Sequence, residues 1–253
     1  MNKTNPEDLL KAQVHLGHRK QKINPASKKF IYKIESGVSI IDLFQTAPQL
    51  DKALEFIRNL GKEGKIITFV ATKKGARDIV EEIAKKNNLT YITNKWVGGF
   101  LTNFSEVHKN VELLNTLTGE KERGEWNKYV KHERVTLEKK MRRITSIYEG
   151  VLTLDKIPDA LFIIDIKKEK NAVTEAKRCE IRTVALVDTN SDPGLVDYPI
   201  IGNDDALTSV QFIVENIVGA YLEGLALHKI ENDKASKIAQ KKAEKEKKIS
   251  SNV

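Results

Sequence analysis

The chain has 253 residues, 40% of them hydrophobic and 31% charged, and its formal net charge is +8. This length can bury one substantial core, and the positive excess favours a polyanionic partner, either nucleic acid or an acidic membrane surface. The single cysteine, Cys179, excludes an internal disulfide and a cysteine-rich zinc site. The N-terminus lacks an apolar signal core and no apolar run reaches membrane-spanning length, so we expect a cytosolic protein.

The N-terminal segment predicts one helix that ends at Gly17, followed by an irregular basic loop over residues 18–33. The loop interleaves basic side chains with Phe30 and Tyr32, a pattern that suits an RNA backbone with occasional base stacking. The same aromatic residues also suit a loop that is pinned to the core while its lysines are merely solvated. The candidate RNA-binding residues of this loop are His18, Arg19, Lys20, Lys22, Lys28 and Lys29.

Strands and helices then alternate along the chain. Short apolar runs predict strands at residues 38–43, 66–71, 91–92, 160–166, 183–187 and 199–202. Helical patterns lie between most of these strands, and a long amphipathic helix runs from the capping residues 203–205 to His228. Helices that connect consecutive strands predict right-handed crossovers, and therefore an α/β fold with a parallel sheet covered by helices on both faces.

A segment with coiled-coil spacing interrupts this alternation. Apolar residues recur three and four positions apart at Phe104, Val107, Val111 and Leu114, and again at Leu137, Met141, Ile144, Tyr148 and Val151. The pattern predicts an inserted antiparallel coiled-coil hairpin over residues 104–151. The α/β globular domain then comprises residues 1–103 and 152–228, and the charged tail 229–253 is predicted to be disordered or a solvated helix.

The segment NKWVGGFLTN, residues 94–103, combines several unusual residues in one turn. Gly98-Gly99 allows positive φ and close approach of another backbone. Lys95 can meet a phosphate, and Trp96 offers a flat apolar face with one N–H donor. We interpret the segment either as a tight turn with a buried tryptophan or as a rigid recognition turn. In the second case its candidate RNA contacts are Lys95, Trp96 and Asn103.

Basic residues also follow the strand predicted at 66–71. Lys73 and Lys74 stand at the start of the next helix, with Arg77 one turn later. A helix N-terminus with two lysines suits a phosphate group, although a solvated helix start explains the same residues equally well. The glycine patterns of a P-loop and of a dinucleotide-binding turn are both absent from the sequence.

Carboxylates follow the later strands and raise the question of catalysis. Asp188 and Asp192, with His18 and the acids at 204–205, could hold a divalent ion, and a phosphohydrolase would use Asp165 with Asp188 and Asp192. However, no catalytic signature is visible in the sequence, and aspartates in such turns serve their own backbone. We therefore predict no catalysis, no cofactor and no small-molecule substrate, with a structural divalent ion near Asp188 as the alternative.

Five motifs occur in an order that resembles a known family. They are VHLGH at 14–18, NKWVGGFLTN at 94–103, PDALFIID at 158–165, VDTNSDP at 187–193 and IIGNDDA at 200–206. Together they resemble the uS2 family of small-subunit ribosomal proteins, in its bacterial or organellar form, over residues 5–228. Gln13 stands where that family often has Gly, Leu16 where Phe is usual, and Lys95 where Arg is common, so the bidentate contact of an Arg is lost there.

The resemblance implies a three-layer flavodoxin-like core with the inserted hairpin, and no enzymatic activity. It implies a structural constituent of the small (30S) subunit that binds 16S rRNA at the head–body junction late in assembly. It also implies contacts with other small-subunit proteins, including the large mRNA-binding first protein that the family helps to anchor. The expected location is the cytoplasmic ribosome, and an organelle-encoded copy fits the same residues.

Overall fold

The computed structural model describes the backbone of residues 4–250 and the side chains of residues 4–231. A five-stranded parallel sheet with the strand order β5-β4-β6-β7-β8 lies at its centre. The strands are β4 (Ile67–Val70), β5 (Thr90–Ile92), β6 (Ala160–Ile164), β7 (Arg182–Val187) and β8 (Tyr198–Ile201). Counted from β4, this order is 2-1-3-4-5, which is the flavodoxin-like arrangement. The predicted parallel α/β sheet is therefore confirmed.

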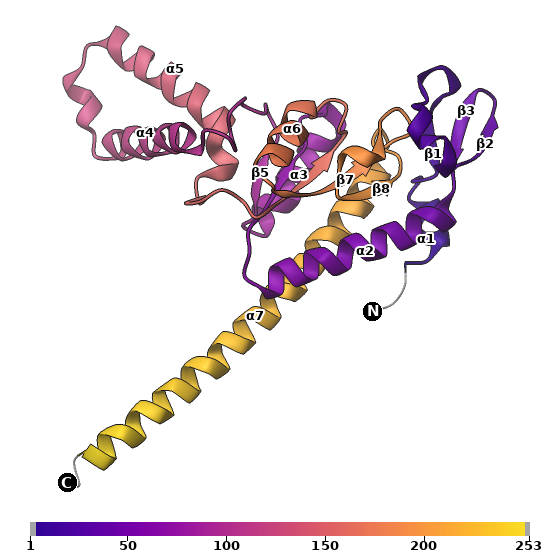
Figure 1. Cartoon of the computed structure of the whole chain (residues 1–253). Helices are drawn as coiled ribbons and strands as arrows, with labels where there is room; N and C mark the ends of the chain where they lie inside the picture. The colour runs from indigo at the N-terminus through magenta and orange to yellow at the C-terminus, as the bar shows by residue number, and fades with distance from the viewer. Residues whose placement is uncertain (1–3, 251–253) are drawn as a thin grey trace.

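Helices form a layer on each face of this sheet (Figure 1). One layer contains α1 (Pro6–Lys11), α2 (Leu43–Lys62), α3 (Lys74–Lys86) and the first part of α7 (Leu207–Ser250). The other contains α6 (Lys170–Arg178) and the turn at residues 96–101. Phe69 and Phe162 pack into the first layer, whereas Val70 and Ile163 pack into the second. Because both faces are covered, the strands are apolar almost throughout.

A second, three-stranded antiparallel sheet corrects the expectation for the N-terminal region. It has the order β1-β3-β2 and consists of β1 (Leu16–Arg19), β2 (Ile31–Glu35) and β3 (Val38–Ile41). The predicted N-terminal helix is present, but it ends at Lys11 and not at Gly17, and the irregular loop predicted over residues 18–33 is wrong. Residues 18–33 instead run through the end of β1, two short 3₁₀ helices at Lys20–Lys22 and Pro25–Phe30, and the start of β2.

Backbone conformations at two points explain this difference. Gln13 adopts a left-handed φ of 62°, and the Val14 N–H donates to Leu9 O, which ends α1 and turns the chain. Ser36 and Gly37 have φ values of 49° and 81°, so β2 and β3 are joined by a two-residue turn of the kind that hairpins favour. The Ser-Gly pair is the sequence signal that indicates this hairpin.

Two helices fill the interruption between β5 and β6. They are α4 (Phe104–Glu122) and α5 (Lys131–Tyr148), with 3₁₀ turns at Glu125–Lys128 and Glu149–Val151. In Figure 1 the pair projects away from the sheet, and the chain leaves along α4 and returns along α5. Apolar side chains of α4 such as Val111 and Leu114 are buried, whereas Leu137 and Met141 of α5 are only half-buried. A regular coiled-coil seam therefore stays a prediction.

The last helix is longer than expected. Its backbone continues to Ser250, so of the two alternatives predicted for the tail 229–253 the structure describes a helix over residues 229–250. Residues 251–253 lie outside the described residues. Lys, Glu and Ala dominate there, and all three are strong helix formers. Residues Leu207–Glu231 are also long and apolar enough to cross a membrane, with a mean hydropathy of 1.3. Their apolar side chains are used inside the protein, since Val210, Ile213 and Ile217 are at most 1% exposed.

Two glycines allow α2 and α7 to pack closely. A Cβ atom at Gly224 would lie 2.2 Å from the backbone oxygen of Arg58, and one at Gly61 would lie 2.5 Å from that of Tyr221. The Tyr221 hydroxyl donates to Lys65 O at 2.8 Å beside this crossing. Gly219 lies on the same helix, but its Cβ would meet no atom of the described residues within 4 Å.

We predict that Gly224→Ala destabilises the protein by about 1–3 kcal/mol, because the new methyl group must push two helix backbones apart. Urea unfolding followed by circular dichroism measures this loss. Gly219→Ala is the matched control, and it should leave stability unchanged or raise it by up to about 1 kcal/mol. Equal effects of the two substitutions would contradict the proposed close packing.

Candidate functional site

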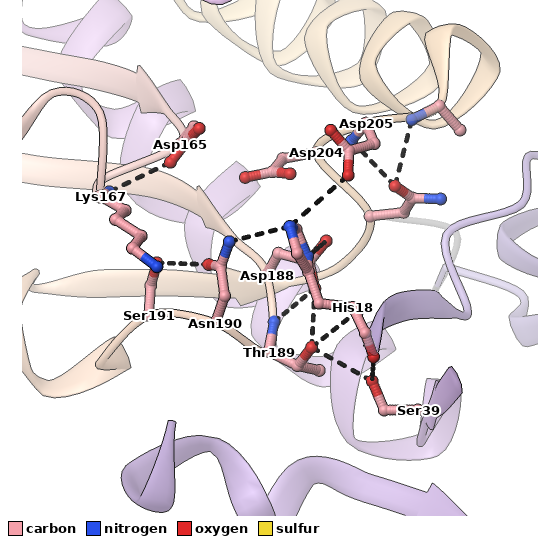
Figure 2. A network of polar contacts seen from close by, with 12 residues as sticks. His18, Ser39, Asp165, Lys167, Asp188, Thr189, Asn190, Ser191, Asp204 and Asp205 are labelled. Carbon is pink, nitrogen blue, oxygen red and sulfur yellow. Dashed lines mark hydrogen bonds and ion pairs between the residues drawn. The ribbon is translucent and has the colours of Figure 1, made fainter. Parts of the chain in front are cut away.

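The carboxyl ends of the parallel strands meet at one edge of the sheet, where polar side chains from distant segments gather (Figure 2). We call this region the carboxyl edge. Open α/β sheets bind their partners at this edge. The candidate residues of the sequence analysis lie on the loops after β4 and β5, in the first residues of α3, or on the N-terminal segment packed against this edge.

His18 fastens the N-terminal segment to the loop after β7. Its Nδ1 atom lies 2.9 Å from Asp188 Oδ2, and its backbone N–H donates to Thr189 Oγ1 at 2.9 Å. The hydroxyl of Ser39 donates to His18 O at 2.8 Å. The contact with Asp188 raises the pKa of His18 above its ordinary value, against the opposing effect of burial. His18 therefore links the N-terminal segment to the loop after β7 inside the fold.

Lys73 is also turned inward. Its Nζ atom lies 2.7 Å from Asp204 Oδ1, 2.5 Å from Asp205 Oδ1 and 3.9 Å from Asp165 Oδ2. Burial opposes the charge of Lys73, but hydrogen bonds from both neighbouring carboxylates raise its pKa overall. Burial, followed by the charge of Asp188, raises the pKa of Asp204 to about 7. Lys73 thus neutralises the protein's own carboxylates.

The loops after β4 and β6 are tied directly to each other. Glu169 is 3% exposed and accepts hydrogen bonds from the Thr72 N–H at 3.2 Å and from the Thr72 hydroxyl. Lys168 Nζ donates to Thr72 O at 2.6 Å. Burial raises the pKa of Glu169, although the bonds from Thr72 partly oppose this effect. These contacts hold Thr72 in place, two residues before α3 begins at Lys74.

A buried glutamate of α6 holds the turn at residues 94–103. Glu175 accepts hydrogen bonds from Trp96 Nε1 at 3.1 Å, from the Gly99 N–H at 2.8 Å and from the Leu101 N–H at 3.1 Å. Gly99 has a φ of 88°, which explains the need for glycine. The ring of Trp96 is only 7% exposed, and its centroid lies 5.1 Å from that of Phe100. The turn is rigid, and its tryptophan packs in the core.

The candidate residues therefore divide into two groups. His18, Lys73 and Trp96 have internal partners and little or no free surface. Arg77 is half-buried, with its Nε on Asp78 Oδ1 at 3.1 Å. The exposed members are Arg19, Lys20, Lys22, Lys28, Lys29, Lys74, Lys95 and Asn103. Contact of these side chains with RNA stays a prediction.

Sequence reasoning missed three residues of this region. Lys167 and Lys168 follow β6 at the same edge and are exposed, and the rule that selected the lysines after β4 would have selected them too. Glu175 gave no local signal, because its partners are 74 to 79 positions away in the chain. Only the packing of α6 against the turn reveals its role.

The comparisons with known proteins now decide the family. A family model described as "Ribosomal protein S2" matches residues 9–224. The chain belongs to the ribosomal protein S2 family. It is 41% identical over 218 residues to the small ribosomal subunit protein uS2 of Bdellovibrio bacteriovorus, with 86% of this chain and 70% of that protein covered.

Two further relatives match this chain over a larger share of their own length. The identity is 40% to the uS2 protein of Coprothermobacter proteolyticus, with 86% of this chain and 81% of that protein covered. It is 39% to that of Dictyoglomus thermophilum, with 90% and 92% covered. The predicted resemblance is thus confirmed, and the S2 chain is a structural constituent of the small ribosomal subunit and not an enzyme.

The carboxylates of the alternative phosphohydrolase have structural partners that agree with this assignment. Asp165 Oδ1 accepts from the backbone N–H groups of Lys167 and Lys168, both at 3.1 Å. Asp192 Oδ1 accepts from the Gly194 N–H at 2.9 Å. Both are turn and capping interactions of the kind that short polar side chains favour.

We predict that Glu175→Gln destabilises the S2 chain by about 1–3 kcal/mol, because an amide cannot accept all three hydrogen bonds of the turn. The loss is measured by urea unfolding. Glu180→Gln is the matched control, since Glu180 is exposed and lies in the turn after α6, and it should change stability by less than about 0.5 kcal/mol. A neutral result for Glu175→Gln would show that the turn does not depend on this clamp.

Glu169 generates a prediction about pH. Its pKa is raised in the folded state, so the folded protein binds this proton more tightly than the unfolded chain does. The stability that this group contributes is therefore present at low pH and is lost as pH rises from about 4.5 through the folded pKa. Glu169→Gln removes this dependence, so its stability relative to the parent should rise between pH 4.5 and pH 8. Parallel stability curves for the two proteins would refute the assignment.

Proposed function

We propose that this S2-family chain binds 16S-type rRNA through exposed basic side chains at the carboxyl edge. We define the basic rim as these side chains: Arg19, Lys20, Lys22, Lys28, Lys29, Lys74, Lys95 and Lys167. Asn103 adds a polar contact at the end of the turn. The single observation that supports the proposal is that side chains from four separate segments, all exposed and all basic, follow or flank strands that end at one edge.

The internal partners of the edge support the same proposal. Free carboxylates under the rim would repel an RNA backbone, but Asp188 and Asp204 are buried and face His18 and Lys73. The rim therefore presents cations above acids that are buried. The loops beneath it are tied by Glu169 and Glu175, so little conformational entropy is lost when RNA is bound.

Phosphate contacts are expected to dominate this binding, because lysine acts on RNA as a point charge. Affinity should therefore fall with salt, with a log–log slope of roughly 0.7 to 0.9 for each phosphate neutralised. The exposed residues Lys139, Lys140, Arg142 and Arg143 of α5 add a second basic surface on the projecting hairpin. This surface would reach rRNA elements away from the sheet.

The finer assignments rest on the family resemblance. We infer binding at the head–body junction, entry late in subunit assembly, and a role in anchoring the large mRNA-binding first protein of the subunit in the cytoplasmic ribosome. Small subunits depleted of this chain and then reconstituted with it test the last role. Retention of the mRNA-binding protein should require the chain, and equal retention without it would remove the anchoring role.

Charge reversals at the two ends of α3 test the basic rim. Lys74→Glu lies at the start of the helix, at the carboxyl edge, and should weaken binding of a 16S rRNA fragment and reduce the salt slope by about 0.7–0.9. Lys86→Glu makes the same change at the exposed C-terminal end of the helix and should leave both quantities unchanged. Filter binding at several salt concentrations measures them.

Two results would contradict RNA binding at the basic rim. If Lys74→Glu and Lys86→Glu weaken rRNA binding to the same extent, the binding is non-specific attraction to net charge. If Lys74→Glu binds and enters small subunits like the parent chain, the start of α3 lies outside the RNA interface. Circular dichroism of both variants verifies that the sheet is intact.

A further inference from the structure

Four residues at the carboxyl edge bring possible metal ligands together. His18 of β1, Asp188 after β7, and Asp204 and Asp205 after β8 each offer one ligand atom, and these four atoms lie within 4.8 Å of one another. Figure 2 shows His18 between Asp188 and Asp205, with Asp204 beside them. Clusters of acids occur without any ion, so the hydrogen-bond partners of each oxygen must be considered.

In each of the three carboxylates one oxygen has a strong partner. Oδ1 of Asp204 and Oδ1 of Asp205 bind Lys73 Nζ at 2.7 and 2.5 Å. Oδ1 of Asp188 accepts from the Thr189 hydroxyl at 2.9 Å. Oδ2 of Asp188 lies 2.9 Å from His18 Nδ1, whereas Oδ2 of Asp204 is buried and accepts no hydrogen bond from the described residues. Their side chains are only 1% and 0% exposed, whereas buried polar atoms are normally partnered.

The charges around these oxygens do not balance. The carboxylates are those of Asp165, Asp188, Asp204 and Asp205, and the cations that face them are Lys73 and the protonated form of His18. Four negative charges against two positive charges leave an excess of two negative charges when every carboxylate is ionised. A divalent cation that replaces the proton on His18 reduces this excess to one negative charge.

We propose that His18, Asp188, Asp204 and Asp205 form a binding site for one divalent transition-metal ion of the Mn²⁺ or Zn²⁺ type. Such ions accept both imidazole nitrogen and carboxylate oxygen. Neighbouring ligands of an ion with bonds of about 2.1 Å lie roughly 3.0–3.4 Å apart. His18 can offer only one of its ring nitrogens to an ion. The four ligand atoms, one from each residue, all lie within 4.8 Å of one another, so small side-chain movements would bring them into one coordination sphere.

Binding would join three parts of the fold. The ion would replace the proton on His18 and bind the Oδ2 atoms of the three aspartates. Lys73 would keep its contacts with the Oδ1 atoms of Asp204 and Asp205. The ion thereby links β1, which leads into the basic N-terminal segment, to the loops after β7 and β8. This inference does not depend on RNA binding and is tested on the isolated full-length chain.

The experiment titrates chelator-treated protein with Mn²⁺, followed by the electron paramagnetic resonance signal of the free ion, and repeats it with Zn²⁺ followed by thermal unfolding. We expect one ion per chain and a higher unfolding midpoint with the ion. Asp205→Asn and Asp188→Asn should each weaken binding by about ten-fold or more, since losing even an outer partner of a metal ligand costs roughly that much. Asp192→Asn is the matched control in the loop of Asp188 and should bind like the parent.

The result that overturns the proposal is a parent chain that binds neither ion, or one whose affinity is the same in Asp205→Asn and Asp192→Asn. Asp205 is 61% exposed, so its amide variant is expected to fold and decides the question even if Asp188→Asn does not. Titration of the parent chain gives the stoichiometry independently of any variant.

Discussion

The contact between Lys73 and the carboxylates after β8 is the constraint on which the carboxyl edge depends. Lys73 follows β4, which lies inside the sheet next to the edge strand β5, while Asp204 and Asp205 follow β8 at the opposite edge. One ammonium group therefore spans the edge and neutralises acids that are partly or fully buried. Removing one partner of such a pair leaves an uncompensated charge in the interior, which is far more costly than losing a surface ion pair.

Around this contact the protein separates structural charge from exposed charge. Buried carboxylates, namely those of Glu169, Glu175 and Asp188, each hold a loop through hydrogen bonds to backbone or side-chain donors. Exposed lysines and arginines stand on the same loops and on the N-terminal segment. In the proposed RNA complex this division would keep the buried acids that shape the loops away from the phosphates.

The sequence predicts the central sheet well because its strands are covered on both faces and are therefore continuous apolar runs separated by amphipathic helices. The three-stranded sheet escaped prediction because β2 is largely exposed and carries Tyr32, Lys33 and Ile34 without clear alternation. The start of β1 depends on the left-handed conformation of Gln13. Non-glycine residues adopt it at a cost, so local propensity there favours the helix that we first predicted.

The sequence predicts where the candidate residues lie along the carboxyl edge, but not which way their side chains turn. Residue type and position after a strand correctly brought Lys73 and Lys74 to the carboxyl edge, but they cannot say which of two adjacent lysines turns inward. That choice is made by Asp204 and Asp205, more than 130 positions away. Trp96 likewise has a ring that could stack on a base. In the structure its indole N–H donates to the distant Glu175, and the ring is buried. Long-range partners, which sequence patterns do not contain, decide both cases.

The ties between the loops after β4 and β6 have one more consequence. In a sheet of this strand order, the crevice between those two strands is where flavodoxin-like proteins hold a cofactor. Here Thr72, Lys168 and Glu169 bridge that crevice with their own hydrogen bonds. These side chains occupy the position that a cofactor would take in such a sheet. The proposed RNA partner would therefore have to bind outside the crevice, on the exposed side chains of the loops.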